Sequence, residues 1–380
     1  MTDPSLEAIR QQYRERYHDQ LGRGRSEVTT PALLLDLDVA RRNIATMAAR
    51  FRELPTELRP HIKVHKSPEL SLLQVQAGAI GVACATVWEA SVMAKAGIAD
   101  VLIANQVVQP DKVEALAALA AEHHLTVAVD DVRNVDQLEA AAARHGAAID
   151  VLVEIDVGMG RCGVRSNEEA LQVAGHAAAS SRLRFCGMQG YEGHCMLEPD
   201  PEVRLRATTA ANARLLEAVD YLAAHGLPSP IVSGGGTGTY YITGANPAMT
   251  EIQAGSYALM DCFHGVLVPG GFEFALTVLG TVVSAKGGTV VLDVGRKAVG
   301  IDFVIPPLAH IEGGEVRYYA EEHCLIDFAG APPLALGDTA ELLAGYGPTT
   351  VNLHDVFHVV ERGVVTDIWP VTPRGAGRPN

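Results

Sequence analysis

The segment from Leu58 to Lys66 reads Leu-Arg-Pro-His-Ile-Lys-Val-His-Lys and places several basic side chains at the predicted end of a short strand. Ser67-Pro-Glu69 follows at once and is typical of a helix start, so Lys63 precedes a strand-to-helix turn. Barrel enzymes form their sites at the carboxyl ends of strands, and an amine there can bind an aldehyde covalently. Lys63 is therefore a candidate for covalent chemistry. A solvated basic loop is the alternative interpretation.

A glycine-rich stretch from Val232 to Tyr240 has the composition of an anion-binding turn. It reads Val-Ser-Gly-Gly-Gly-Thr-Gly-Thr-Tyr and follows the seventh predicted strand, where barrels commonly bind phosphate. Glycines let backbone N–H groups surround an anion, and serine and threonine hydroxyls add donors. Because Ala254-Gly-Ser-Tyr257 ends the eighth predicted strand, we predict a phosphate cradle here rather than only a tight connection.

Two further loops carry polar groups at predicted strand ends. Asp156-Val-Gly-Met-Gly-Arg161 follows the fifth strand and brings Arg161 to the barrel mouth, where its charge can keep a phenolate ionised. Gln189-Gly-Tyr-Glu-Gly-His194 ends the sixth strand. Tyr191 and His194 are therefore predicted neighbours of a ring-shaped cofactor, with His194 as a candidate proton carrier. A solvated arginine and a structural histidine are the alternatives.

The elements that must position these residues follow from the hydrophobic pattern. Short β-rich runs alternate with longer Ala-rich helical runs, which predicts parallel strands joined by right-handed crossovers. Eight such units close into a (β/α)8 TIM barrel, whereas the competing doubly wound sheet would carry a glycine fingerprint that is absent after the first strand. The predicted strands are Leu58–Lys63, Gly81–Thr86, Val101–Val108, Leu125–Asp130, Asp150–Val157, Leu183–Gly193, Pro230–Gly234 and Glu251–Tyr257.

After about Asp261 the pattern changes to short β-type runs separated by Gly, Pro and Asp, which predicts a second, mainly β domain. A strand at 32–37 is expected to join it, and residues 1–27 are expected to form a surface or subunit-contact helix. The predicted domains are a barrel over 38–262 and a β-domain formed by 1–37 plus 263–380. The predicted strands after the barrel are Phe274–Ser284, Thr289–Gly295, Val316–Ala320, Thr339–Ala344 and Val359–Trp369.

Composition narrows the class of protein. The chain has 380 residues, 48% of them hydrophobic, and a net charge of -15, which argues against a nucleic-acid partner. No apolar run is long enough for a membrane span, no secretory signal is visible at the start, and the six cysteines form no CxxC pair. These features predict a cytoplasmic metabolic protein with reduced cysteines and a small-molecule substrate.

A lysine, an arginine, a phosphate cradle and ring-contacting groups at one rim describe a pocket for pyridoxal 5'-phosphate. In order and spacing, the motifs closely resemble the D-threonine aldolase and D-serine dehydratase family of alanine-racemase-like, fold-type III pyridoxal phosphate enzymes. The resemblance covers roughly residues 28 to 370. The motifs that carry it are Thr30–Asp38, Arg59–Lys66, Asp156–Arg161, Gln189–His194, Ser233–Thr239 and Gln253–Tyr257.

This resemblance implies roles for individual residues. Lys63 would be the Schiff-base lysine, Arg161 would lie near the phenolic oxygen of the cofactor, and Tyr191 would lie near its ring. It also implies a head-to-tail homodimer in which the β-domain of one subunit covers the barrel mouth of the other. The remaining residues that we predict to bind the cofactor, mainly at its phosphate, are Ser233, Gly235, Gly236, Thr237, Gly255, Ser256 and Tyr257.

One departure from the family pattern concerns a metal ion. Family members usually carry a His-x-Cys or His-x-Asp pair before a Pro-Thr-Val-Asn-Leu run, where a divalent ion grips the substrate hydroxyl. Here Gly345-Tyr-Gly-Pro-Thr-Thr-Val-Asn-Leu353 places Tyr346 and Pro348 at the two ligand positions. Proline has no side-chain donor, so we predict that the usual metal site is lost. A protein base must then move protons, and His194, His61 and Tyr346 are the candidates.

The leading hypothesis is a pyridoxal phosphate-dependent lyase that cleaves D-configured β-hydroxy-α-amino acids in a retro-aldol reaction. D-serine or D-3-hydroxyaspartate dehydration, racemisation and metal-independent aldol transfer are the alternatives. A non-catalytic cofactor-carrying protein is a hypothesis of another class, which the β-domain after Asp261 argues against because single-barrel carriers lack it. An unrelated barrel enzyme with a phosphorylated substrate is the remaining hypothesis.

Overall fold

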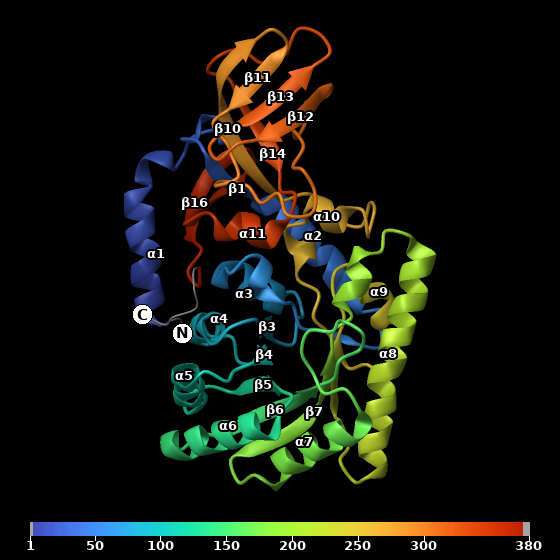
Figure 1. Ribbon diagram of the computed structural model, residues 1–380. Coiled ribbons are helices and arrows are strands. Elements are labelled where there is room, and N and C mark those ends of the chain that lie inside the picture. The colour runs from blue at the N-terminus through green and yellow to red at the C-terminus, as the bar shows by residue number, and fades with distance from the viewer. Residues whose placement is uncertain (1–2, 375–380) are drawn as a thin grey trace.

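In the computed structural model, which describes residues 3–374, a barrel lies below a β-domain (Figure 1). The ends of the predicted β-domain, 1–2 and 375–380, lie outside the described residues. The barrel sheet has eight parallel strands in the order β2-β9-β8-β7-β6-β5-β4-β3. Its strands are β2 (Glu57–Leu58), β3 (Val82–Cys84), β4 (Val101–Gln106), β5 (Leu125–Val129), β6 (Ile149–Glu154), β7 (Leu183–Gly190), β8 (Ile231–Gly234) and β9 (Glu251–Ile252).

The sheet closes between its two edge strands, β2 and β3. The Ile80 N–H donates to Leu58 O at 3.0 Å, the Ala83 N–H donates to Pro60 O at 2.9 Å, and His61 forms a parallel bridge with Ala83. Each of the eight predicted strands is present, so the predicted barrel is confirmed. Strands β3, β5 and β6 are buried along their whole length, as expected of parallel strands covered by helices.

Helices cover the outside of the barrel (Figure 1). Several begin at a capping side chain; for example, the Ser67 Oγ accepts a hydrogen bond from the Leu70 N–H at 3.2 Å directly after the Lys63 turn. The helices of this region are α2 (Leu37–Phe51), α3 (Pro68–Gln76), α4 (Val87–Lys95), α5 (Pro110–Ala120), α6 (Val132–His145), α7 (Asn167–Ala179), α8 (Pro201–Ala224), α9 (Tyr240–Thr243) and α10 (Cys262–Gly265).

The β-domain is a second eight-stranded sheet in the order β12-β13-β11-β10-β1-β15-β16, with β14 beside β10. Helix α1 (Pro4–Arg16) packs against β16, and α11 (Gly347–Asn352) packs against the Lys63 turn. The strands are β1 (Ala32–Asp36), β10 (Leu276–Lys286), β11 (Thr289–Leu292), β12 (Gly314–Tyr319), β13 (Cys324–Phe328), β14 (Thr339–Leu343), β15 (Val356–Glu361) and β16 (Val364–Pro370). The predicted joining of the early strand to this sheet is confirmed.

The structure corrects two local predictions and adds two elements that were not predicted. The first barrel strand does not reach Lys63, because Ile62–Val64 form a 3-10 turn in which the His65 N–H donates to Ile62 O at 3.0 Å. The single strand predicted over 359–369 is wrong. Arg362 and Gly363 both have positive φ and turn the chain, so β15 and β16 form an antiparallel hairpin. The sequence reading also missed β13 and α11.

Two buried clusters show how the domains are joined. One fills the space between most of the barrel strands and their helices. The other is continuous from the barrel into the β-domain and includes Leu58, Ile252 and Tyr257 from the barrel side with Leu276 and Val351 from the β-domain side. Because apolar packing is continuous across the junction, the β-domain has a fixed place above the carboxyl ends of β2 and β9.

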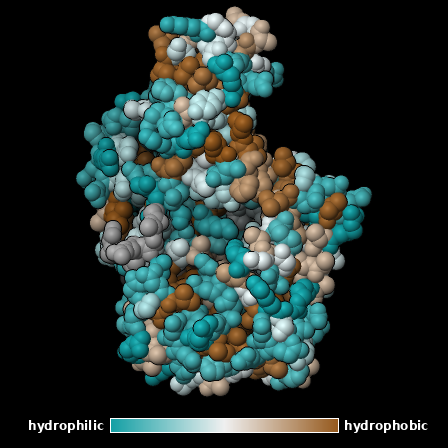
Figure 2. Space-filling model, in the orientation of Figure 1, coloured by the Kyte–Doolittle hydropathy of each residue, from teal (hydrophilic) through white to brown (hydrophobic). Residues whose placement is uncertain are grey.

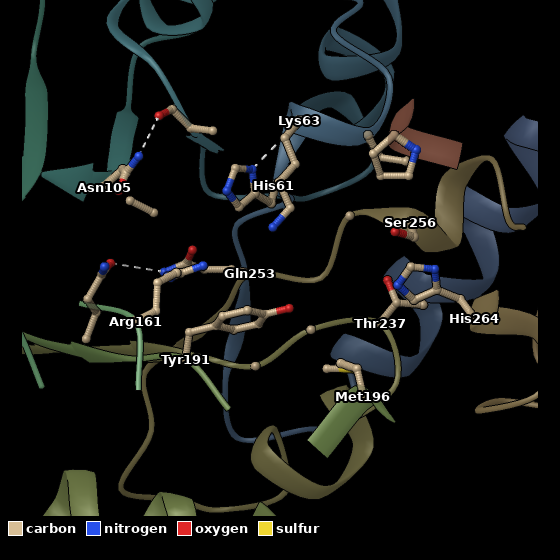
Figure 3. Close-up of a pocket in the computed structure, with 18 of the residues that line it drawn as sticks. His61, Lys63, Asn105, Arg161, Tyr191, Met196, Thr237, Gln253, Ser256 and His264 are labelled. Carbon is tan, nitrogen blue, oxygen red and sulfur yellow. Dashed lines mark hydrogen bonds between the residues drawn. The ribbon is translucent and has the colours of Figure 1, made fainter. Parts of the chain in front are cut away.

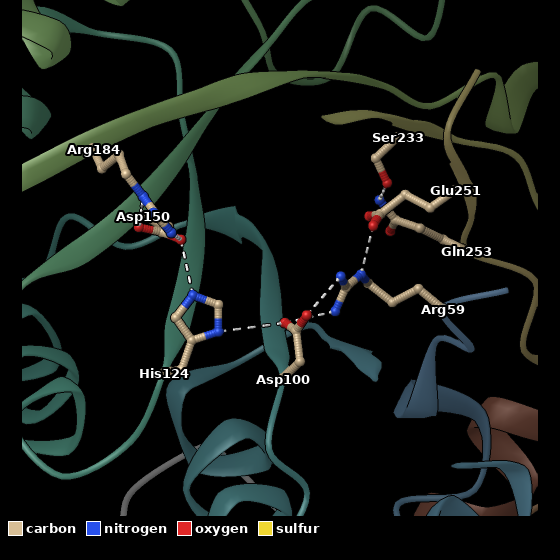
Figure 4. Close-up of polar contacts among 8 residues, drawn as sticks. All are labelled: Arg59, Asp100, His124, Asp150, Arg184, Ser233, Glu251 and Gln253. Carbon is tan, nitrogen blue, oxygen red and sulfur yellow. Dashed lines mark hydrogen bonds and ion pairs between the residues drawn. The ribbon is translucent and has the colours of Figure 1, made fainter. Parts of the chain in front are cut away.

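A network of charged residues lies near the beginnings of the barrel strands, at the end opposite Lys63 (Figure 4). The Arg59 guanidinium is buried and donates to Glu251 Oε2 at 2.9 Å and to the Asp100 carboxylate at 2.9 and 3.1 Å. His124 Nε2 lies 2.8 Å from Asp150 Oδ2. These ion pairs tie neighbouring strands together at the floor of the barrel.

The visible face of the molecule is mainly hydrophilic, with hydrophobic side chains gathered in small patches (Figure 2). Within residues 3–374, no helix combines the length and the apolar character that crossing a bilayer requires.

Candidate active site

A cavity of about 250 Å³ lies at the carboxyl ends of the barrel strands, roofed by α10 and α11. It collects residues from nine segments of the chain, which are spread between positions 61 and 348. Most of the predicted site residues line it. They are Lys63, Arg161, Tyr191, Gly235, Gly236, Thr237, Gly255, Ser256 and Tyr346, together with His61 and Pro348.

Three predicted site residues lie behind the cavity wall. Ser233 is fully buried, and its Oγ accepts a hydrogen bond from Gln253 Nε2 at 2.8 Å. The Tyr257 hydroxyl points into the core and accepts from Gln74 Nε2 at 2.9 Å, so only its backbone is near the cradle. His194 is absent from the cavity lining, and a Cβ on Gly158 would meet the His194 ring at 3.1 Å.

Lys63 has the electrostatic setting of a nucleophilic amine. Its Nζ lies 5.4 Å from the centroid of the Tyr191 ring (Figure 3). Burial, with a smaller contribution from the Arg161 charge, lowers the pKa of Lys63 from 10.5 to about 8. At neutral pH a useful fraction of this amine is therefore uncharged and able to attack an aldehyde.

His61 is the neighbour of Lys63 along the cavity wall. Its Nδ1 accepts a long hydrogen bond, 3.4 Å, from the Lys63 N–H. Burial, together with the charge of Lys63 and then of Arg161, lowers the pKa of His61 well below 6.5. The imidazole is consequently neutral at physiological pH.

Arg161 also lies near the Tyr191 ring, with its Cζ 5.5 Å from the ring centroid. Its Nη2 is 3.5 Å from Glu154 Oε1, and that buried carboxylate also accepts from Gln106 Nε2 at 2.8 Å and Gln189 Nε2 at 3.0 Å. The guanidinium is thus directed into the cavity by a carboxylate that is itself fixed by two amides.

The glycines of the cradle are required by close backbone packing. A Cβ on Gly255 would meet His61 O at 2.1 Å, and Gly235 has φ of +78° with a potential Cβ only 2.8 Å from Ile252. The hydroxyls of Thr237 and Ser256 line the same side of the cavity. Backbone can therefore approach an anion here without side chains in between.

Glu192 stabilises the conformation of this cradle. Sequence reasoning did not identify it as a site residue, although it lies within the predicted motif at 189–194. It is fully buried, and its carboxylate accepts hydrogen bonds from the Gly235 N–H at 3.1 Å, Thr239 Oγ1 at 2.8 Å and Thr243 Oγ1 at 2.6 Å. Both oxygens of Glu192 are committed to protein donors, so this residue positions the loop.

His264 is a further cavity residue that sequence reasoning missed. Its backbone N–H and its Nδ1 each lie 2.8 Å from Asp261 Oδ1, while Asp261 Oδ2 accepts from the Gly347 N–H at 2.8 Å. The spacing Asp-x-x-His at a short helix start was the available signal.

Tyr346 and Pro348 face the cavity from the start of α11. The Tyr346 ring lies nearly parallel to His264, with centroids 6.0 Å apart. Burial, followed by the nearby Asp261 and Asp302 carboxylates, raises the pKa of Tyr346, so its phenol stays protonated at neutral pH. Over residues 3–374 no three His, Cys, Asp or Glu side chains gather in a way that could ligate a metal ion.

Both domains of the chain match domains of known proteins. Residues 35–262 match the alanine racemase N-terminal domain, and residues 275–360 match a putative serine dehydratase domain. The chain is 39% identical over 367 residues to 3-hydroxy-D-aspartate aldolase of Paracoccus denitrificans, covering 94% of this chain and 95% of that protein. It is 37% identical over 358 residues to D-threonine aldolase of Arthrobacter, covering 93% and 94%.

A solved structure agrees with these relatives. The crystal structure of D-threonine aldolase from Filomicrobium marinum superimposes with a TM-score of 0.90 at 38% identity, covering 93% of this chain and 98% of that one. Membership in this family excludes the single-barrel carrier and the unrelated barrel enzyme. The chain belongs to the D-threonine aldolase-like family of alanine-racemase-like, fold-type III enzymes and is a pyridoxal phosphate-dependent lyase.

Proposed function

We propose that this enzyme cleaves the Cα–Cβ bond of D-configured β-hydroxy-α-amino acids by a retro-aldol reaction that yields an aldehyde and an amino acid. The observation that carries the proposal is the position of Lys63. Its amine, with a pKa lowered to about 8, faces the same cavity as a glycine-rich cradle. The aldolase relatives from Paracoccus and Arthrobacter support this choice of reaction.

The residues present fit pyridoxal 5'-phosphate. Lys63 would hold the aldehyde, Arg161 and Tyr191 would lie beside the ring, and the loops containing Gly235 and Gly255 would hold the phosphate. The fit rests on the close packing of those glycines, since a Cβ on Gly255 would collide with backbone. When bound, this cofactor withdraws electron density from the bond that breaks at the substrate Cα.

Among the protein groups, His61 is the best-placed acceptor for the β-hydroxyl proton. It lines the cavity beside Lys63 and is neutral, so it can accept a proton. Tyr346 has a raised pKa and is therefore assigned a hydrogen-bonding role toward substrate instead of the role of a base. The predicted proton transfer by His194 receives no support from its position outside the cavity lining.

Product analysis with D-threonine, D-serine and D-3-hydroxyaspartate tests the reaction. An aldehyde with an amino acid supports aldol cleavage, whereas a 2-oxo acid with ammonia supports dehydration. Dehydration remains the second candidate because the chain is 32% identical over 277 residues to D-threo-3-hydroxyaspartate dehydratase of Delftia. Inversion of the substrate without cleavage would contradict both and indicate a racemase.

We also propose the homodimer that the family resemblance implies, with the β-domain (1–37 plus 263–380) of one subunit above the barrel (38–262) of its partner. Apolar side chains near the cavity support it. Phe303 is 53% exposed and lies edge-on to Tyr346, with ring centroids 4.9 Å apart, and Val266 and Ile305 are also exposed. Sedimentation of the wild type and of Phe303→Asp tests this, and a monomeric active wild type would contradict it.

A further inference from the structure

The cradle side of the cavity holds neutral donors and one histidine. Thr237 and Ser256 offer hydroxyls there, and His264 lines the same cavity and is drawn toward the same end of it in Figure 3. The other three basic residues that line the cavity are Lys63, His61 and Arg161, and they lie around Tyr191 on the opposite side.

His264 is oriented by a buried carboxylate. Asp261 is fully buried, and its Oδ1 accepts from the His264 Nδ1–H at 2.8 Å, because a carboxylate can only accept in this pair. That bond fixes the ring and leaves Nε2 as its remaining polar atom. No hydrogen bond from Nε2 to any of residues 3–374 is formed, although His264 lines the cavity.

A phosphate dianion in this cradle would be stabilised by a positively charged donor in addition to neutral ones. Backbone N–H groups and hydroxyls supply partial charges, whereas an imidazolium supplies a full one and a stronger, charge-assisted hydrogen bond. Because Nδ1 is bound to Asp261, Nε2 is the ring nitrogen that remains to meet an oxyanion in the cavity.

We propose that His264, positioned by Asp261, is the cationic contact of the cofactor phosphate: its Nε2–H donates to a phosphate oxygen. The inference rests on the proposed function, since it concerns the same cofactor. A purely architectural role is the alternative, in which Asp261 joins α10 to α11 through the Gly347 N–H and His264 only fills space. The two roles differ in whether His264 distinguishes a phosphorylated ligand from an unphosphorylated one.

The test compares pyridoxal phosphate with pyridoxal, which has the same ring but no phosphate; the fraction of pyridoxal that is closed to its cyclic hemiacetal in water is the same for every variant and cancels when variants are compared. Dissociation constants for both are measured on the full-length apo-enzyme from the absorbance of the bound cofactor. We expect His264→Gln to weaken pyridoxal phosphate about tenfold to a hundredfold, the range for losing a hydrogen bond to a charged group, and to leave pyridoxal nearly unchanged. Asp261→Asn should reduce the preference in the same direction by a smaller factor.

His61→Gln is the matched control, because it makes the same substitution on the opposite wall of the same cavity. It should alter both dissociation constants together and keep their ratio. An unchanged ratio in His264→Gln, or an equal loss of preference in the two variants, overturns the inference. If the glutamine variant fails to fold, His264→Asn is measured in its place. A wild-type protein that binds neither ligand through Lys63 would instead refute the proposed function.

Discussion

The lowered pKa of Lys63 predicts how fast the apo-enzyme captures its cofactor at each pH. Only the uncharged amine attacks an aldehyde, so the capture rate should rise with pH and level off above the Lys63 pKa of about 8. At pH 7 a lysine with this pKa is about one-tenth uncharged, compared with roughly one part in three thousand for a pKa of 10.5. Burial should thus raise the uncharged, reactive fraction of Lys63 at pH 7 by about 300-fold.

Stopped-flow absorbance between pH 6 and 10 measures this, with 5'-deoxypyridoxal as the ligand because it has neither a phosphate that titrates nor a 5'-hydroxyl that closes onto the aldehyde. Arg161→Gln removes the positive charge that contributes to the shift, so its midpoint should move upward. Lys63→Ala should show no capture and serves as the blank. A wild-type midpoint near 10 would refute the reasoning, because it would mean that Lys63 is solvated like a surface lysine.

Three further predictions concern the supporting structure and the metal. Glu192→Gln replaces an acceptor with an N–H₂ group facing the Gly235 N–H or the threonine hydroxyls, so the affinity for pyridoxal phosphate measured by titration should fall about tenfold or more. Glu251→Ala leaves the buried Arg59 half-paired and should lower the free energy of unfolding by about 3 kcal/mol in urea titrations, whereas the exposed Arg184→Gln should change it by less than about 1 kcal/mol. Dialysis against a chelator should leave turnover unchanged, and recovery only on adding a divalent ion would contradict the predicted loss of the metal site.

Sequence periodicity was sufficient for the architecture. Alternating β-rich and helical runs set the order of the eight barrel strands, because a parallel strand buried on both faces needs a continuous apolar run and its crossover needs an amphipathic helix. The same reasoning wrongly predicted β15 and β16 as a single strand. A hairpin turn at Arg362-Gly363 depends on backbone conformation, which the apolar pattern does not show.

Local motifs likewise determined which residues could perform chemistry. Lys63, Arg161 and Tyr191 were identified from residue type and position at strand ends, and the fold brings them to one cavity. The direction in which each side chain points could not be predicted from these motifs. Tyr257 belongs to the predicted cradle motif, yet its hydroxyl points into the core toward Gln74, because the 3-10 turn at 256–258 rotates successive side chains to different sides.

What the sequence determined by itself was therefore the fold, the family and the nucleophilic lysine, since these depend on periodicity and on short motifs that act locally. Only the tertiary structure revealed that the Asp261–His264 pair lies at the cradle and that the Glu192 carboxylate is fully hydrogen-bonded to protein groups. It also showed that His194 does not line the cavity. Asp261 and His264 are only three residues apart, but their place at the cavity depends on the distant contact of Asp261 with Gly347, and Glu192 likewise binds groups more than 40 residues away. Hydrogen-bond partners and packing set the direction of each of these side chains, and both exist only once the chain has packed.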